Sequence, residues 1–384
     1  MKLYLLFKPV SLRSDKGHRQ ATWLELFFDL SFVLVIAALT TMLVKNPTLG
    51  GLAMYVGLFF PVFWAWNQLA WYANQFDNND VFFRVLYLSV ILLVLVLAAS
   101  IEKISKGNTG LFVIAYVLIQ GFLAAGWVRV YINNLEFKSF SLKILIGPVV
   151  GGVVWLVSLG LPIPQQYYAW AVALVIQVSA PYIAWKTKTF DIPIHISHIV
   201  ERYCLLTIIV LGETLVAVSA GMNSVLGSGE ALTAIFGYVT IACIWWTYFN
   251  WDFDNVHRFK GLSNVFAFGY GHFVVFILIA AFGAGVEIAI HSSEHGGGHS
   301  TLLERMLILF TPPLYLISLS ILNRFSWGMS FDKKMKARIV VAIISLSFAL
   351  IPVHAPTVVL TGVIALLMVC LVSYEVIFCA TSQD

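Results

Sequence analysis

Charged residues are unusually few in this sequence. Only 11% of its 384 residues are Asp, Glu, Lys or Arg, whereas 60% are hydrophobic and the mean hydropathy is +0.89. A soluble globular protein carries about 25% charged residues, because its surface must face water. No run of like charge exceeds a few residues, which excludes a nucleic-acid binder and a charged disordered tail. The composition excludes a soluble enzyme and predicts an integral membrane protein in contact with the lipid bilayer.

Cysteine and the common catalytic motifs are also scarce or missing. The four cysteines lie in apolar runs without a CxxC spacing, which indicates buried thiols rather than disulfides or a metal site. The sequence contains no phosphate loop, nucleophile elbow or HExxH motif, so no cofactor is expected. The hydrophobic stretch before Lys8 is too short for the core of a signal peptide, which predicts a cytoplasmic N-terminus.

Long apolar segments, in contrast, fill the chain. A membrane-spanning helix needs about 20 mostly apolar residues, because lipid offers no partner for backbone polar groups. Polar, charged and Gly/Pro-rich breaks divide the sequence into twelve such segments, which predicts an all-α, polytopic membrane bundle. The pairs joined around Pro162 and around His354 could instead be hairpins that do not fully cross. The expected helices are 22–44, 51–75, 82–101, 110–132, 143–161, 165–185, 199–225, 231–251, 262–288, 302–323, 337–352 and 357–378.

Positive charge is unevenly distributed between the loops. With residues 1–21 as a cytoplasmic tail, only four of the 23 Lys and Arg residues fall on the outer side, namely Lys45, Lys103, Lys106 and Arg305. Cytoplasmic loops of membrane proteins carry the excess of Lys and Arg. A miscount by one helix would invert the later loops and remove this bias. The sequence therefore predicts twelve helices with both termini cytoplasmic.

Two tryptophan-rich segments share a pattern that indicates duplication. At an offset of 180 residues, Trp66 aligns with Trp246 and Trp71 with Trp251, and each segment leads into an acidic loop that contains Asn. An interfacial belt of aromatic residues would explain the tryptophans without a repeat. The matched spacing favours a parallel 6+6 architecture. Its two six-helix halves would be residues 22–190 and 191–384.

Carboxylates lie inside several of these apolar segments. Glu25 and Asp29 are four residues apart on one face of the first segment, and Glu213 lies near the middle of the seventh. At an offset of 184 residues Asp29 aligns with Glu213, which gives one acid in each predicted half. A charge in the hydrocarbon costs about 2.5–3.5 kcal/mol, so an intramembrane acid is a functional candidate by default. Such acids bind a cation, carry a proton or act as structural pins. As pins they would pair with a buried donor, for which the candidates are Arg84, Arg129, Trp66 and Trp246.

The start of the seventh segment carries a first group of histidines. His195, His198 and Glu201 recur every three residues, and these side chains could bind a transition metal. A spacing of three drifts around a helix by about 60° per step, however, which suits three ligands of one ion poorly. A hydrogen-bonded helix start is therefore the favoured interpretation.

Four further candidate histidines lie later in the chain. His291, His295 and His299 lie with Glu294 in a glycine-rich outer loop that could capture zinc or copper, most simply as an incidental site. His272 stands alone in the ninth segment. A packed histidine is the favoured interpretation of His272, and a proton relay is the alternative.

Two long segments resemble signatures of the bacterial low temperature requirement A family. The first is WLELFFDLSFV at residues 23–33, and the second is HIVERYCLLTIIVLGET at residues 198–214. The acidic loop before Arg84 is also similar, and Cys204 stands where family members usually have glycine. The resemblance covers nearly the whole chain and implies a polytopic inner-membrane protein of a family named for growth in the cold. The functional candidates that it singles out are Glu25, Asp29, His198, Glu201, Arg202 and Glu213.

These features favour a secondary transporter, or a channel, for a small solute or ion. In this hypothesis Asp29 and Glu213 bind a cation or carry a proton, and Glu25 and His272 are further candidate binding groups. The cavity would be shaped by Trp66, Trp71, Trp246 and Trp251.

Two alternatives stay open. One is an intramembrane enzyme that acts on lipid with a metal held by His195, His198 and Glu201, which stoichiometric metal in the purified protein would identify. The other is a membrane stress or assembly factor that transports nothing. In that case the acids are structural, and removing them lowers protein abundance rather than turnover.

Overall fold

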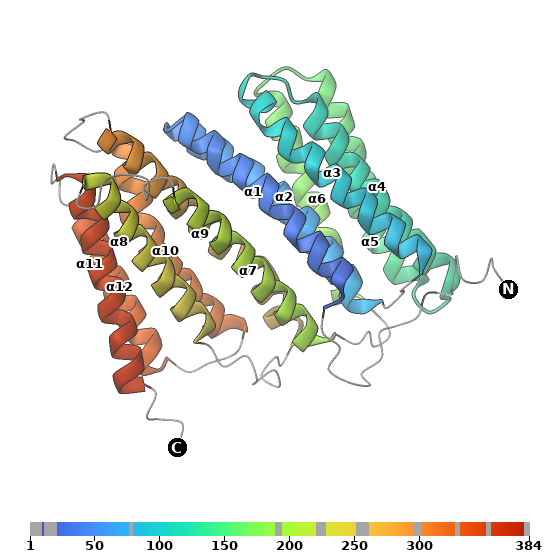
Figure 1. Cartoon of the computed structure of the whole chain (residues 1–384). Helices are drawn as coiled ribbons and strands as arrows, with labels where there is room; N and C mark the ends of the chain where they lie inside the picture. Colours follow the sequence, from blue (N-terminus) through green and yellow to red (C-terminus); the bar gives the residue numbers. More distant parts are fainter. Residues whose placement is uncertain are drawn as a thin grey trace. The chain divides into compact units, whose positions relative to one another are not determined.

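The computed structural model describes an all-α chain, as predicted (Figure 1). The residues described are residue 10 and residues 21–76, 80–188, 194–219, 228–250, 261–294, 301–326, 331–350 and 355–379. Within them lie twelve α-helices, of which ten are long and apolar enough to cross a membrane. The helices α7 and α11 are not among these ten.

The helices follow the predicted segments closely. The predicted end of the seventh helix at residue 225 lies outside the described residues, within which α7 reaches Ser219. The helix α9 continues to Glu294, past its predicted end at residue 288, because its polar last turn is held by hydrogen bonds. There Ser292 Oγ donates to the carbonyl of Ala289 and to Glu304. In chain order the helices are α1 (Trp23–Lys45), α2 (Leu49–Gln75), α3 (Val81–Ser105), α4 (Gly110–Asn133), α5 (Lys138–Val157), the 3-10 turn η2 (Ser158–Gly160), α6 (Gln165–Lys186), α7 (Ile196–Ser219), α8 (Gly229–Phe249), α9 (Leu262–Glu294), α10 (Leu302–Ser326), α11 (Lys333–Leu350) and α12 (Thr357–Cys379).

The chain divides into two compact units. The first unit comprises residues 1–39 and 57–206, and the second comprises residues 40–56 and 207–384. As a consequence, α1, α2 and α7 each contribute residues to both units. The duplication into two six-helix halves stays a prediction.

In the first unit α3, α4, α5 and α6 lie side by side (Figure 1). Aromatic rings fill the space between α4, α5 and α6, where the ring centroid of Trp155 lies 4.6 Å from that of Tyr116 and 4.7 Å from that of Trp170. The helices α5 and α6 also pack closely at a glycine. A Cβ added at Gly151 would lie 2.6 Å from Gln177, so the glycine is what permits this approach.

In the second unit α9 packs against both α8 and α10. Two glycines of α9 allow this close packing. A Cβ added at Gly283 would lie 2.8 Å from the side chain of Thr214 on α7, and one at Gly285 would lie 2.7 Å from that of Leu307 on α10. The helices α7, α9 and α10 therefore meet with little side-chain volume between them.

Large apolar side chains are exposed along the helices, for example Leu92, Val175 and Leu366. Such exposure is costly in water and is typical of a surface that faces lipid. Cys243 is buried as the sequence predicts, whereas Cys370 is exposed on α12. The apolar exterior and the ten candidate spans agree in describing a multi-pass membrane protein.

Candidate functional site

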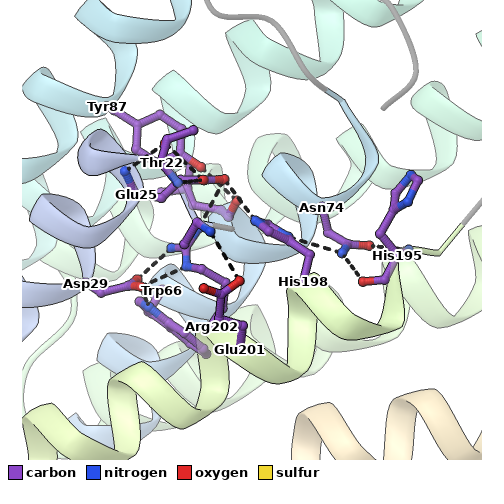
Figure 2. A network of polar contacts seen from close by, with 12 residues as sticks. Thr22, Glu25, Asp29, Trp66, Asn74, Tyr87, His195, His198, Glu201 and Arg202 are labelled. Carbon is purple, nitrogen blue, oxygen red and sulfur yellow. Dashed lines mark hydrogen bonds and ion pairs between the residues drawn. The ribbon is translucent and has the colours of Figure 1, made fainter. Parts of the chain in front are cut away.

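Charged side chains gather at the beginning of α1 and α7 in the first unit (Figure 2). Glu25 and Asp29 are one turn apart on α1, and His198 and Arg202 are one turn apart on α7. All four side chains are buried, and Asp29 and Arg202 are 0% exposed. Because the spacing of four residues puts each pair on one helix face, two acids of α1 meet two basic groups of α7.

Arg202 binds Asp29 with two hydrogen bonds. Its Nε donates to Oδ2 of Asp29 at 2.7 Å, and its Nη2 donates to Oδ1 at 2.6 Å. The indole Nε1 of Trp66 on α2 donates to the same Oδ1 at 2.7 Å. A bidentate pair of hydrogen bonds between arginine and a carboxylate is among the strongest charge-assisted contacts. Both oxygens of Asp29 are thus occupied by donors, and its charge is compensated.

Glu25 lies on the other side of Arg202 and also caps α1. Its Oε1 lies 3.4 Å from Nη1 of Arg202 and 3.3 Å from Nε2 of His198. Its Oε2 accepts hydrogen bonds from the backbone N–H and the hydroxyl of Thr22, at 2.7 and 2.9 Å. The backbone N–H of Glu25 in turn donates to Thr22 Oγ1 at 3.3 Å, which completes a capping box. One side chain therefore joins the start of α1 to α7.

Asn74 of α2 fixes the start of α7 (Figure 2). Its Nδ2 donates to the carbonyl of His195 at 2.7 Å, and its Oδ1 accepts from the backbone N–H of His195 at 3.3 Å. The same Nδ2 lies 3.3 Å from Nδ1 of His198. The two ring nitrogens of His198 are therefore directed at Asn74 and at Glu25.

The predicted metal ligands at the start of α7 are held by other contacts. Oε2 of Glu201 accepts the backbone N–H of Ala21 at 3.1 Å. Over the part of the chain that the structure describes, no group of three or more His, Cys, Asp or Glu side chains is placed to hold a metal ion. His195, His198 and Glu201 are therefore not brought together around one ion.

Tyr203 of α7 connects two residues of α2. Its hydroxyl donates to Oδ1 of Asn67 and accepts from Nε1 of Trp71 at 3.3 Å. Its ring packs edge-on against Trp66, with ring centroids 4.8 Å apart. Trp66 and Trp71 are thus bonded within the first unit, whereas Trp246 of the second unit is 41% exposed. Trp251 lies outside the described residues.

Among the expected partners of Asp29, only Trp66 is confirmed. Pairing of Asp29 with Arg84 or Arg129 is wrong, because Arg129 binds Asp80 and Arg84 is exposed. The cation that binds Asp29 is Arg202, which lies 173 residues further along the chain. The family resemblance marked Arg202, but no spacing rule connects it to Asp29.

Glu213 of α7 lies in the second unit in different surroundings. Its side chain is 7% exposed, and its Oε1 accepts a hydrogen bond from the hydroxyl of Thr40 on α1. Its Oε2 has no hydrogen-bond partner among the described residues, nor does any described Lys, Arg or His form an ion pair with Glu213. Tyr55 of α2 and Glu287 of α9 interact with it electrostatically.

The remaining predicted histidines lie on or after α9. His272 is buried, with Nε2 2.9 Å from the hydroxyl of Tyr248 and Nδ1 2.7 Å from the carbonyl of Phe268. Both ring nitrogens are thus bonded, as in a packed histidine. His291 is exposed in the last turn of α9, and His295 and His299 lie outside the described residues.

Three carboxylates of the second unit were not predicted as site residues. Glu375 is bound by Arg338, whose Nε donates to its Oε1 at 2.7 Å. Glu304 accepts the backbone N–H of Thr301 at 3.2 Å in a second capping box, and Glu287 is half-buried on α9. The signal that could have found them is the one used for Asp29, an acid inside an apolar segment.

The region that contains Asp29, Arg202 and Glu213 matches a known family. The sequence profile described as Bacterial low temperature requirement A protein (LtrA) matches residues 20–373. A protein of Rhizobium meliloti (strain 1021) that is described as uncharacterized is 26% identical over 390 residues, which cover 93% of this chain and 90% of that protein. Because the match spans α1 to α11 and most of α12, this chain belongs to the bacterial low temperature requirement A family.

Proposed function

We propose that this multi-pass membrane protein is a secondary transporter, or a channel, for a small solute or ion, and that Glu213 binds the cation or proton involved. The observation behind this proposal is the incomplete set of partners around a buried carboxyl. One oxygen of Glu213 is bonded to Thr40, and the other has no hydrogen-bond partner among the residues that the structure describes.

Energetics support a functional role for Glu213. A charge buried in an apolar interior is normally paired, because an isolated ion loses its hydration without compensation. Asp29 and Glu375 follow this rule, since each is bound by a buried arginine. A carboxyl inside a membrane that lacks such a cation is typical of an ion or proton pathway.

We assign the cluster around Asp29 a structural role in the same protein. Its hydrogen bonds to Arg202 and Trp66 connect α1, α7 and α2 and use both carboxylate oxygens of Asp29. An additional ion there would have to displace a guanidinium that is already bound in two places. In this proposal Asp29 holds helices together, and Glu213 binds the transported cation or proton.

Inner-membrane location with cytoplasmic termini is part of the proposal. It is supported by the distribution of Lys and Arg, of which only four of 23 fall in the predicted outer loops. The metal-dependent enzyme has less support, because His198 and Glu201 are engaged by Glu25 and by the backbone of Ala21.

Ion flux through the purified protein in sealed liposomes tests the proposal. Gradients of H⁺, Na⁺ and K⁺ are imposed in turn, and flux is followed with entrapped indicator dyes. We expect Glu213→Gln to lower the flux by about tenfold or more, since the loss of ~1.4 kcal/mol of transition-state interaction slows a step tenfold. Glu304→Gln is the matched control, because Glu304 is also a buried carboxyl of the second unit but is bonded to Ser292 and Thr301.

Two results would contradict the proposal. One is a wild-type flux no greater than that of protein-free liposomes for all three ions. The other is a Glu213→Gln flux equal to that of the wild type.

A further inference from the structure

We infer that Glu213 and Glu287 form one site in which two carboxyl groups hold a single proton between them. This inference rests on the proposed function and names the ligand of the same site. The sequence alone does not predict this pairing, because the two residues are far apart in the chain. Only Glu213 lies within a segment that resembles a family signature.

The backbones of α7 and α9 approach each other next to these two residues. A Cβ added at Gly283 would lie 2.8 Å from Cγ2 and 3.2 Å from Cα of Thr214, and Thr214 Oγ1 donates to the carbonyl of Ile279 at 3.4 Å. Glu213 directly precedes Thr214, and Glu287 follows Gly283 by four residues on the same face of α9. The contact between the helices therefore places residues 213 and 287 on neighbouring turns of α7 and α9, and the two acids interact electrostatically.

The basic side chain that interacts with this pair of acids is His291, which is exposed on α9 one turn beyond Glu287. Among the described residues, no Lys, Arg or His is ion-paired with Glu213, and the group that interacts with it electrostatically from α9 is Glu287, a second acid. Two carboxylates that share an apolar site do not both ionise readily, because each charge opposes the other. Holding one proton leaves the pair with a single negative charge.

The other neighbours of Glu213 are polar but carry no charge. The hydroxyl of Thr40 on α1 donates a hydrogen bond to Oε1 of Glu213. The hydroxyl of Tyr55 on α2 donates to the carbonyl of Ile277 at 3.0 Å. The free oxygen of Glu213, Oε2, is therefore the atom available for a shared proton.

Access to the pair is supported by its place near the end of α9. Glu287 is half-buried, and His291 follows it by one turn and is exposed in the last turn of the helix. His291 also interacts electrostatically with Glu287. Glu304 lies at the same end of the helix but is bonded to Ser292 and Thr301, so it is not counted in the site.

Labelling with dicyclohexylcarbodiimide tests the shared proton directly, because this reagent reacts with protonated carboxyl groups in apolar surroundings. The full-length protein in detergent is labelled at pH near 7, and the extent of modification of Glu213 is measured by peptide mass spectrometry. We expect Glu213 to be labelled in the wild type and to be labelled severalfold less in Glu287→Gln, since the charge that favours its protonated form is gone.

Two further variants exclude a merely structural effect. Glu287→Asp keeps the charge and should retain most of the labelling of Glu213, whereas Glu304→Gln should leave it at the wild-type extent. All variants are compared as monodisperse protein by size-exclusion chromatography. Equal labelling of Glu213 in the wild type and Glu287→Gln, or no labelling in the wild type, would overturn the inference.

The labelling and the flux experiments separate this inference from the proposed function. Labelling of Glu213 that depends on Glu287, together with a flux that is indifferent to Glu213, would keep the shared proton and remove the transport function. Flux that requires Glu213, together with labelling that is indifferent to Glu287, would keep the transport function and overturn the shared proton.

Discussion

Asp29 and Glu213 are both buried carboxylates on long helices, yet their surroundings differ. Asp29, in the first unit, accepts two hydrogen bonds from Arg202 and one from Trp66. Glu213, in the second unit, accepts one hydrogen bond from Thr40, and no described cation pairs with it. The difference teaches that burial alone does not distinguish a structural carboxylate from a functional one. The distinction depends on whether a cation is paired with the carboxylate.

A third acid shows that the contrast concerns partners rather than units. Glu375 lies in the second unit, as Glu213 does, but it accepts hydrogen bonds from Nε and Nη2 of Arg338 at 2.7 and 3.1 Å. Nη2 of Arg338 also donates to the carbonyl of Thr247 at 3.1 Å, which ties α11 to α8 and α12. Substitutions that remove a partner should therefore be more harmful at Asp29 than at Glu213.

The largest effect is expected from Arg202→Met. Removing the guanidinium leaves Asp29 as an uncompensated buried charge, which costs about 3–5 kcal/mol of stability. Thermal unfolding in detergent should show a much lower midpoint, with little folded protein recovered. The double variant Asp29→Asn/Arg202→Met is the control, because it removes both charges and should recover part of the loss. An unfolding midpoint equal to that of the wild type would contradict the assignment of Asp29 as a structural acid.

The next largest effect is expected from Trp66→Phe. Phenylalanine keeps an aromatic ring but loses the donor to Asp29, and a hydrogen bond to a charged group contributes about 1.5–3 kcal/mol. Trp71→Phe is the matched control, because Trp71 donates to the neutral hydroxyl of Tyr203 at 3.3 Å. Unfolding midpoints should fall further for Trp66→Phe than for Trp71→Phe. The reverse order would mean that the indole of Trp66 is not a principal donor to Asp29.

A smaller change in stability is expected from Glu213→Gln. The amide keeps a polar group beside Thr40 and removes a charge that no described cation compensates, so stability should stay within about 1 kcal/mol of the wild type or rise. Flux in liposomes should nevertheless be lost. A fall in the unfolding midpoint as large as that of Arg202→Met would show that Glu213 is structural after all.

The smallest effect is expected from Trp246→Phe, although the sequence aligns Trp246 with Trp66. Trp246 is 41% exposed, and surface substitutions usually change stability by no more than about 0.5 kcal/mol. The unfolding midpoint should therefore match that of the wild type. A loss comparable to that of Trp66→Phe would favour equivalent roles for the two tryptophans, as a repeat predicts.

The helices could be predicted from the sequence because their signal is local. Stretches of about 20 apolar residues mark them, and α4 and α6 begin at their predicted residues. The end of α9 differs because hydrogen bonds of Ser292 extend the helix through a polar turn. One of these hydrogen bonds is made to Glu304 on α10, and the average hydropathy of the residues in α9 contains no information about it.

The acids of the candidate site could be predicted, but their partners could not. Asp29 and Glu213 stand out as charges in apolar segments, and the spacing of Thr22 and Glu25 is that of a capping box. The choice of Arg202 among 23 Lys and Arg residues depends on how α1 packs against α7. The electrostatic interaction of Glu287 with Glu213 likewise depends on how α9 packs against α7, which it approaches where Gly283 lies against Thr214.

The most direct test compares Asp29→Asn and Glu213→Gln in the same liposome assay, with the flux divided by the amount of folded protein. The account predicts that Asp29→Asn lowers the recovery of folded protein but keeps the wild-type flux per molecule, whereas Glu213→Gln folds normally and loses the flux. Loss of flux per folded molecule in Asp29→Asn, together with wild-type flux in Glu213→Gln, would contradict it.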